Sequence, residues 1–146
     1  MQADRPVRSE GDMSELKGSC LCGAIAFEVT GPVRGVGSCH CSKCRKVSGT
    51  GGNAQFIVRA EKFRWLRGLD RIVTFKLPDG WGASRCNACG SPLPDSHDGG
   101  KRIWVPAGLM DDPLNTQIVQ HIFCGSRADW DEEAEDARYY DEYPTS

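Results

Sequence analysis

The chain has 146 residues, of which 39% are apolar and 26% are charged, and its formal net charge is −2. That length suits one domain with a single core, and no apolar run reaches the roughly 18 residues that a membrane-spanning helix needs. The first residues, Met1 to Lys17, lack the apolar segment of a secretory signal. We therefore expect a cytoplasmic protein that is not embedded in a membrane.

Charge is divided unevenly along the chain. Up to Arg127 there are 17 Lys and Arg against 12 Asp and Glu, a net of +5, whereas the following residues hold 8 acids against Arg138 alone, a net of −7. The positive excess suits a small anionic ligand but is too small to indicate a nucleic-acid partner. We interpret residues 128–146 as an acidic C-terminal tail that packs on the domain or trails from it.

Short apolar segments alternate with turns rich in glycine and proline, which is typical of a mostly β domain. The first segment, residues 24–30, alternates cleanly and places Ile25, Phe27 and Val29 on one face. Further strands are predicted at residues 53–58, 63–67, 71–77, 101–105 and 117–123.

One of the later predicted strands is strongly amphipathic. Val73, Phe75 and Leu77 share one face of it and polar residues occupy the other. No stretch of ten or more residues in the body of the chain has helical periodicity. We therefore expect small β-sheets over residues 17–127, preceded by a flexible leader at residues 1–16.

Seven of the eight cysteines fall into three clusters. These are Cys20 with Cys22, Cys39 with Cys41 and Cys44, and Cys86 with Cys89. In a chain without an export signal, such clusters indicate metal binding rather than disulfides. Several thiolates close together are the ligand set that zinc prefers.

The two cysteine pairs together supply four ligands. Cys20 and Cys22 leave the same side of the chain at the entry to a strand, and the two-residue gap before Cys89 is the spacing of a tight knuckle. Gly23 and Gly90 follow the pairs directly and allow turns that aim N–H groups at the sulfurs. We expect one closed, structural zinc site here, which would tie the first strand to the later hairpins.

The triplet of Cys39, Cys41 and Cys44 supplies three ligands and leaves a fourth position for water, substrate or another side chain. The side chains that could close the site are Cys124, His40, His97 and His121. A site closed by one of them would be structural, and an open site could be catalytic. We expect His40 to point away from the metal and Cys124 to be a buried small apolar residue.

Positive charge surrounds the triplet. Lys43, Arg45 and Lys46 would offset the net charge of three thiolates on zinc, and the same cations could bind the carboxylates of an anionic ligand. Arg45, Lys46 and Arg127 are the predicted substrate-binding residues. The glycine-rich residues 49–52 lack the Lys-Ser/Thr pair of a phosphate loop, so we interpret them as a loop that approaches the metal closely.

Three motifs occur in order along the chain. They are Gly18-Ser19-Cys20-Leu21-Cys22-Gly23, Cys39-His40-Cys41-Ser42-Lys43-Cys44-Arg45-Lys46 and Cys86-x-x-Cys89-Gly90-Ser91. Further matches downstream are Ala107-Gly108-Leu109, Asp112-Pro113, His121-Ile122, Ser126 and Trp130. Together these segments, spread over about residues 17 to 144, resemble the glutathione-dependent formaldehyde-activating enzyme family, which includes centromere protein V.

The resemblance implies a fold, two cofactors and a reaction. The fold is a β-tent with two zinc ions, a structural one on the two cysteine pairs and a catalytic one on the triplet. The reaction adds a glutathione-like thiol to a small aldehyde such as formaldehyde and gives an S-hydroxymethyl adduct, which is a carbon–sulfur lyase reaction in reverse. The catalytic metal would polarise the carbonyl or stabilise the thiolate.

Two other functions agree with the same cysteine pattern. A zinc-stabilised binding module would hold two tight zinc ions and have no turnover. A zinc sensor or carrier would have one labile site but would not affect adduct formation. The open or closed state of the triplet separates the enzyme from the binding module.

Overall fold

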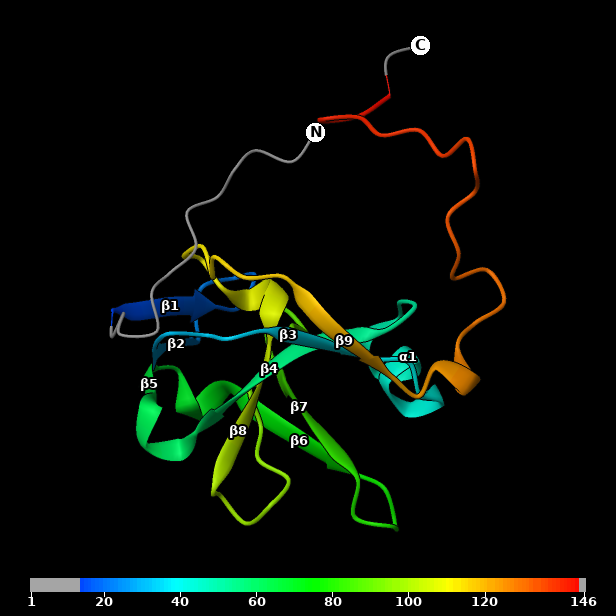
Figure 1. Cartoon of the computed structure of the whole chain (residues 1–146). Coiled ribbons are helices and arrows are strands. Elements are labelled where there is room, and N and C mark those ends of the chain that lie inside the picture. The colour runs from blue at the N-terminus through cyan, green and yellow to red at the C-terminus, as the bar shows by residue number, and fades with distance from the viewer. Residues whose placement is uncertain (1–13, 145–146) are drawn as a thin grey trace.

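A computed structural model describes residues 14–144, which form a mostly β, single-domain structure (Figure 1). The strands in this part of the chain are β1 (Glu15–Ser19), β2 (Ala26–Thr30), β3 (Val36–Cys39), β4 (Asn53–Arg59), β5 (Phe63–Arg67), β6 (Ile72–Lys76), β7 (Gly82–Cys86), β8 (Arg102–Pro106) and β9 (Ile118–Ile122). The helices are α1 (Ser42–Ser48) and the short 3-10 helices Ala60–Lys62, Leu69–Arg71, Ala107–Leu109 and Cys124–Ser126. The expected mostly β fold of small sheets is confirmed.

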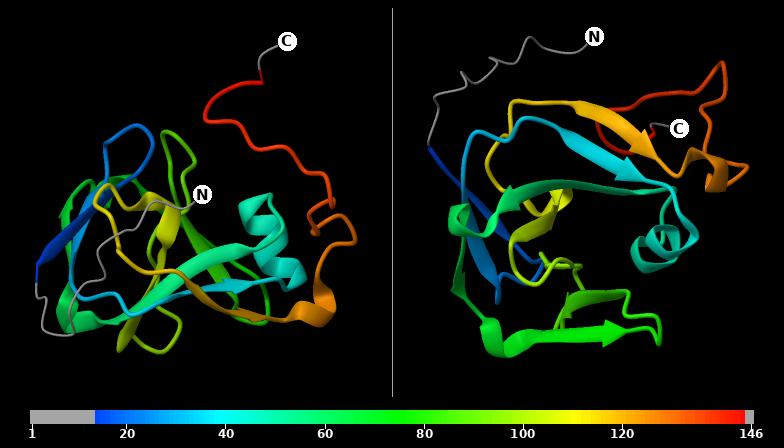
Figure 2. Two further views of the ribbon diagram at one scale, coloured as in Figure 1. Left: turned by 45° about the horizontal axis from the view of Figure 1, so that its top comes forward. Right: turned by 60° about the horizontal axis from the view of Figure 1, so that its bottom comes forward.

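The strands form three small sheets that are inclined to one another. One sheet has the order β1-β2-β5, a second has the order β8-β4-β3-β9, and β6 pairs with β7 as a hairpin. The β3–β9 pair is parallel and the other pairs are antiparallel. In both views of Figure 2, α1 lies beside the ends of β3 and β4, so the second cysteine cluster is at this end of the four-stranded sheet.

The main core fills the space between the first two sheets. Its buried residues are Leu16, Phe27, Val29, Val33, Phe56, Val58 and Val105. A smaller core around Ile25 and Leu93 includes the buried sulfurs of Cys20 and Cys86. Because two of the first cluster's cysteines belong to this second core, the core and a metal at that cluster would stabilise the same part of the molecule.

Strand positions agree closely with the sequence expectation, and the structure adds the direction in which the apolar faces point. The predicted strands at residues 24–30, 53–58, 63–67, 71–77, 101–105 and 117–123 correspond to β2, β4, β5, β6, β8 and β9. Ile25, Phe27 and Val29 are buried as expected. On β6, however, Val73 is 51% and Phe75 is 64% exposed, so the apolar face of this strand turns outward.

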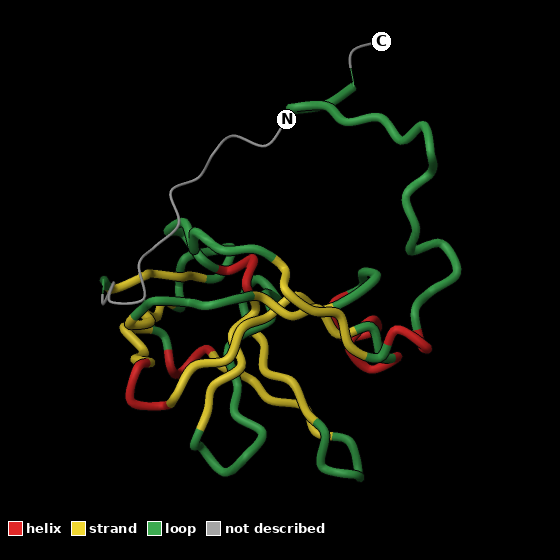
Figure 3. The backbone as a smooth tube through the Cα atoms, viewed as in Figure 1, coloured by secondary structure: helices red, strands yellow, loops and turns green. Residues whose placement is uncertain are grey.

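The chain termini differ in how much of them the structure describes. Residues 1–13 of the expected leader lie outside the described part, but β1 begins at Glu15, two residues before the expected start of the domain. The tail from residue 128 has no helix or strand as far as it is described, and Figure 3 shows it as a loop that leaves the body. Among the described residues, no helix is long and apolar enough to cross a membrane.

Candidate metal centres and the adjoining cavity

The two cysteine pairs come together in the structure as the spacing predicts. The sulfurs of Cys20, Cys22, Cys86 and Cys89 all lie within 4.8 Å of one another. Cys22 Sγ is 3.6 Å from Cys20 Sγ and 3.9 Å from Cys86 Sγ. Tetrahedral zinc with Zn–S bonds of about 2.3 Å separates its sulfurs by about 3.8 Å, so this cluster could hold such an ion with little rearrangement.

Polar hydrogens around the first cluster also suit thiolates. The backbone N–H of Ile25 donates to Cys20 Sγ at 3.3 Å, and that of Ala88 donates to Cys86 Sγ at 3.4 Å. The Ser91 hydroxyl lies 3.3 Å from Cys89 Sγ, and its hydrogen bond, together with backbone hydrogen bonds from Ser91 and Cys22, lowers the pKa of the Cys89 thiol to about 5. Such donors hold the sulfurs in place and stabilise their negative charge, as expected around a thiolate metal site.

The second cluster is built on the start of α1. Cys39 ends β3, Cys41 is the N-cap of the helix and Cys44 lies in its first turn, and the three sulfurs are within 4.8 Å of one another. The N–H of Cys44 donates to Cys41 Sγ at 3.3 Å, so one ligand thiol also caps the helix. The triplet is therefore held by a strand end and a helix rather than by a loop alone.

Cys44 is the cysteine of the triplet whose thiol proton must leave before a metal ion can bind all three sulfurs. Burial raises the pKa of the Cys44 thiol, and hydrogen bonding to Cys39 and Cys41 raises it further. A metal ion that binds all three sulfurs must displace the Cys44 proton. A cluster of three thiols in this geometry could hold zinc, with Cys39, Cys41 and Cys44 as its protein ligands.

Among the described residues, no other His, Cys, Asp or Glu joins the triplet as a ligand group. Cys124 is exposed and its Sγ lies 3.6 Å from the His121 carbonyl oxygen, so the expectation that it is buried is wrong. It lies in the 3-10 helix that follows edge strand β9, where too little chain packs over it to exclude water. His97 packs against the Trp104 ring, with 5.2 Å between ring centroids and 66° between the ring planes.

His40 is turned away from the sulfurs, in agreement with the sequence expectation. The residue is 4% exposed, and Nε2 lies 2.8 Å from His121 Nδ1. Nδ1 faces two acceptors, the Gly51 carbonyl oxygen at 3.0 Å and Asp131 Oδ2 at 3.1 Å, so Nδ1 carries the hydrogen. In the neutral ring, Nε2 then accepts a hydrogen bond from His121. The ring ties the metal loop to β9 and to the start of the tail.

The glycine-rich loop approaches this histidine rather than the sulfurs. A Cβ atom at Gly52 would lie 2.7 Å from Ser38 Oγ and 3.1 Å from the His40 ring, and one at Gly51 would lie 2.9 Å from the Asp131 carboxyl carbon. The loop does make close approaches, but its neighbours are His40, Ser38 and Asp131 and not the sulfurs that would hold the metal. Tertiary contacts of this kind are not visible in a local motif.

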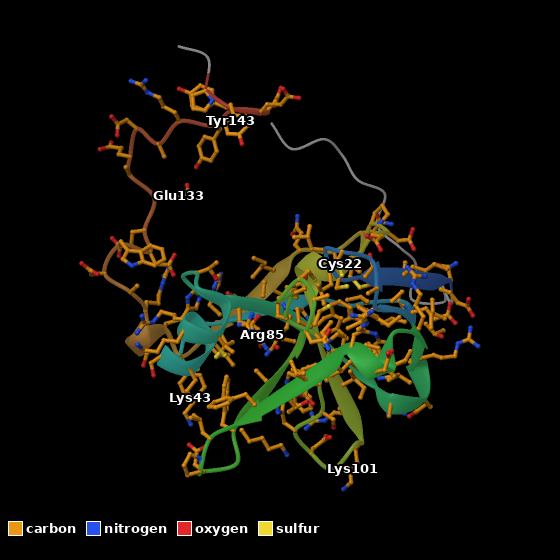
Figure 4. The ribbon with its side chains drawn as sticks, turned by 180° about the vertical axis from the view of Figure 1, so that it is seen from behind. Cys22, Lys43, Arg85, Lys101, Glu133 and Tyr143 are labelled. Carbon is orange, nitrogen blue, oxygen red and sulfur yellow. The ribbon has the colours of Figure 1, made fainter. Side chains whose placement is uncertain are left out.

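A cavity of about 600 Å³ opens beside the triplet. All three cysteines of the triplet line it, and none of the first cluster's cysteines does. Its walls come from α1, from β4 and β8 of the four-stranded sheet, and from the β6–β7 hairpin. Figure 4 shows Cys22, in the first cluster, well separated from Lys43, on the helix that carries the second cluster. Only the second cluster is therefore open to a ligand of this cavity.

In the part of the chain that the structure describes, Lys43 and Arg85 line the cavity, and both already contact protein groups. Lys43 pairs with Asp79 at 2.6 Å and lies 5.9 Å from the centre of the Trp81 ring. Arg85 donates to the Val47 carbonyl oxygen and, at 2.9 Å, to that of Gly90. Figure 4 shows Lys43 and Arg85 on the side of the molecule where α1 faces the hairpin.

The predicted substrate-binding cations have other positions. Arg45, Lys46 and Arg127 do not line the cavity. Arg127 lies 3.6 Å from the Asp131 carboxylate and donates to the Asp131 carbonyl oxygen at 2.8 Å. Arg45 keeps a buried Nε atom without a hydrogen-bond partner among the described residues. An anchoring role for these three side chains remains a prediction, and it would apply outside the cavity.

Sequence reasoning missed most of the cavity wall. Its members outside the cysteine motifs include Asn53, Gln55, Trp81, Ser84, Arg85 and Trp104. Asn53 lies directly opposite Cys39 in the β3–β4 ladder, and Gln55 follows two residues later on the same face. The alternation of polar side chains at the start of β4 was the one local signal that could have indicated these two residues.

Comparisons with known proteins identify a family and a similar fold. A family model described as glutathione-dependent formaldehyde-activating enzyme matches residues 15–126. A crystal structure of a Rhodobacter sphaeroides protein is similar, with a TM-score of 0.52 and 20% sequence identity over 69% of this chain and 98% of that chain. At this identity, the structural likeness supports the fold alone.

Proposed function

The chain belongs to the glutathione-dependent formaldehyde-activating enzyme family, and from this premise we propose that it is a zinc-dependent enzyme of the carbon–sulfur lyase class. It adds a glutathione-like thiol to a small aldehyde and gives an S-hydroxymethyl-type adduct. The observation that carries the proposal is the difference between the two clusters. The triplet lines a cavity of about 600 Å³, whereas the four-cysteine cluster does not reach it.

The reaction is an addition without a redox change. The thiol sulfur forms the new bond to the carbonyl carbon, the π electron pair of the C=O bond moves to oxygen, and the thiol proton ends on that oxygen. Zinc held by Cys39, Cys41 and Cys44 would supply Lewis acidity for the carbonyl or stabilise the attacking thiolate. The reverse reaction cleaves the same C–S bond.

The chain's own groups contribute position and charge. Asn53 faces the triplet from the neighbouring strand, where its amide N–H can donate to the carbonyl oxygen of a bound aldehyde. Arg85, which contacts backbone carbonyl oxygens and no carboxylate among the described residues, places positive charge beside the same cavity, which favours the oxygen as negative charge develops on it. Because thiols add to formaldehyde without a catalyst, holding both reactants together accounts for much of the expected effect.

The direct test is an exchange measurement by NMR of formaldehyde with glutathione, with and without the zinc-loaded protein. We expect faster exchange with the protein, proportional to its concentration, and no acceleration by Cys41→Ser at equal concentration. A protein that holds two zinc ions tightly and leaves the exchange rate unchanged would instead be a binding module. One labile zinc ion together with an unchanged exchange rate would identify a zinc sensor or carrier.

A further inference from the structure

We propose that the second reactant of this enzyme is an aldehyde that carries an apolar, aromatic group, and that this group occupies the cavity beside the triplet. The inference rests on the proposed thiol addition and specifies its substrate. It is carried by the size of the cavity, the residues of its walls and the existing pairing of its charged groups.

The cavity is much larger than formaldehyde requires. A volume of about 600 Å³ corresponds to about 20 water molecules at liquid density. Formaldehyde has only two non-hydrogen atoms and would fill little of it. Cavities of this size hold ligands with many more atoms and bury most of their surface. One reactant must therefore bring a substantial group into this space.

The walls are mainly aromatic and aliphatic. The larger apolar side chains include Val47, Trp81, Leu93, Trp104, Pro106 and Phe123. The Trp104 ring is held by Arg102, 5.0 Å from its centre, and by the steeply inclined His97 ring, while Lys43 lies over Trp81. These contacts fix the Trp81 and Trp104 rings before a ligand binds. A flat apolar group can therefore pack on the rings without the entropy cost of ordering them.

The charged groups of the cavity are already paired with the protein. Lys43 has Asp79, Arg85 has two backbone carbonyl oxygens, and Asp95 accepts the Ser84 hydroxyl at 2.9 Å and the Ser96 N–H at 2.8 Å. A glutathione-like thiol has two carboxylates and an ammonium group, which gain little from an apolar wall with paired charges. Its polar body suits the solvent side of α1, and the cavity is left for the aldehyde.

The polar groups near the sulfurs give the aldehyde a direction. Asn53 and Gln55 line the cavity on the β4 face next to Cys39, and their side-chain amides have no hydrogen-bond partner among the described residues. They suit the carbonyl oxygen, whereas Trp81 and Trp104 lie on the hairpin and on β8. The reacting carbon then lies at the triplet and the aromatic group against the tryptophans.

The test compares benzaldehyde with formaldehyde, both with glutathione and the zinc-loaded protein. We expect the ratio of catalysed to uncatalysed exchange to be at least about tenfold higher for benzaldehyde.

Benzyl alcohol, which cannot form the adduct, should bind, quench tryptophan fluorescence and inhibit competitively against the aldehyde. Trp81→Ala should weaken benzyl alcohol binding by about tenfold or more, and Trp81→Phe should recover most of it. Trp130→Ala is the matched control, because Trp130 is 64% exposed in the tail and does not line the cavity.

The outcomes separate this inference from the proposed function. Acceleration with formaldehyde, no preference for benzaldehyde and no binding of benzyl alcohol would overturn the inference and leave the function intact. Binding of benzyl alcohol without acceleration for any aldehyde would overturn both. A preference for benzyl thiol with formaldehyde over glutathione with benzaldehyde would assign the apolar wall to the thiol and also contradict the inference.

Discussion

Several cysteine sulfur atoms accept hydrogen bonds from backbone N–H groups, and these bonds fix the positions of the sulfurs without a metal ion. In the first cluster, backbone N–H groups of Ile25 and Ala88 point at two sulfurs, and in the second the N–H of Cys44 points at Cys41. Each donor lowers the cost of keeping a thiolate in a fixed position. The difference between the clusters therefore lies in their surroundings, since one adjoins the small core and the other adjoins the cavity.

This difference predicts opposite effects of two similar substitutions. Cys41→Ser should leave a folded domain that holds one zinc ion and has lost activity, because the four-cysteine cluster remains intact. Cys89→Ser should unfold the domain or lower its thermal midpoint strongly, because a structural zinc contributes its binding energy to folding. Zinc content by elemental analysis and thermal unfolding by circular dichroism measure both effects. Equal loss of stability in the two variants would contradict separate structural and catalytic sites.

Close packing at a single glycine gives a second prediction at this scale. Gly18 in β1 lies over the Phe27 ring, and a Cβ atom there would be 2.4 Å from Phe27 Cζ. Phe27 is fully buried in the main core and cannot move aside cheaply. We expect Gly18→Ala to lower the free energy of unfolding by about 1–3 kcal/mol.

Gly108 is the matched control for this substitution, because a Cβ atom there has no neighbour within 4 Å. Gly108→Ala should change the free energy of unfolding by about 0.5 kcal/mol or less. Urea unfolding of both variants provides the measurement. If the two variants were equally stable, the packing of β1 on Phe27 described here would be wrong.

At the scale of elements, periodicity predicted the strands with an alternating apolar pattern and missed β1, β3 and β7, which lack one. β3 (Val-Gly-Ser-Cys) and β7 (Gly-Ala-Ser-Arg-Cys) are short and consist largely of small residues, so they lack an alternating apolar pattern. They form strands because their backbones pair with neighbouring strands, β3 with β4 and β9, and β7 with β6. α1 has seven residues and a cysteine N-cap, which leaves no helical period long enough to detect.

The candidate site was predictable where its residues belong to local motifs, and the pairing of the two distant cysteine pairs followed from counting four zinc ligands. All seven clustered cysteines were identified because ligand spacing is local, and both groups assemble as expected. Trp81, Arg85 and Trp104 reach the cavity from separate strands and loops, so their meeting depends on the tertiary structure. The outward-facing Val73 and Phe75 show the same limit, since alternation defines a face but not the direction in which it points.

A hydrogen-bonded chain fixes the hairpin against the neighbouring segment. Ser84 on β7 is buried; its hydroxyl lies 2.9 Å from the Thr74 hydroxyl and donates to Asp95 at 2.9 Å. Ser84→Ala leaves a partly buried carboxylate oxygen without its donor, so we expect a loss of about 1–3 kcal/mol in the free energy of unfolding.

Thr74→Val removes only the outer hydroxyl of this chain. Because Thr74 is exposed and Ser84 keeps Asp95, the loss should be below about 1 kcal/mol. Denaturant unfolding of the two variants separates these expectations. A larger effect of Thr74→Val than of Ser84→Ala would mean that the chain does not hold the hairpin through Asp95.

For the whole molecule, the main question is where the folded domain ends. Residues 132–144 are all exposed, whereas Asp131 is partly buried beside His40 and Gly51. The net charge of −7 in the tail could attract it to the positive body, but the long separation of most tail residues from the sheets in Figure 1 argues against a fixed contact. The boundary that matters for stability is therefore the start of the tail rather than its acidic end.

Two truncations test this boundary. A chain of residues 1–132 should unfold within about 0.5 kcal/mol of the full chain, because the contact between Tyr139 and Glu133 is internal to the removed segment. A chain of residues 1–127 loses Asp131 and uncovers His40, so it should be less stable by about 1–2 kcal/mol. Denaturant unfolding at low and high salt provides the measurement. If the 1–132 chain were as unstable as the 1–127 chain and salt removed the difference from the full chain, the acidic end would bind the body through charge.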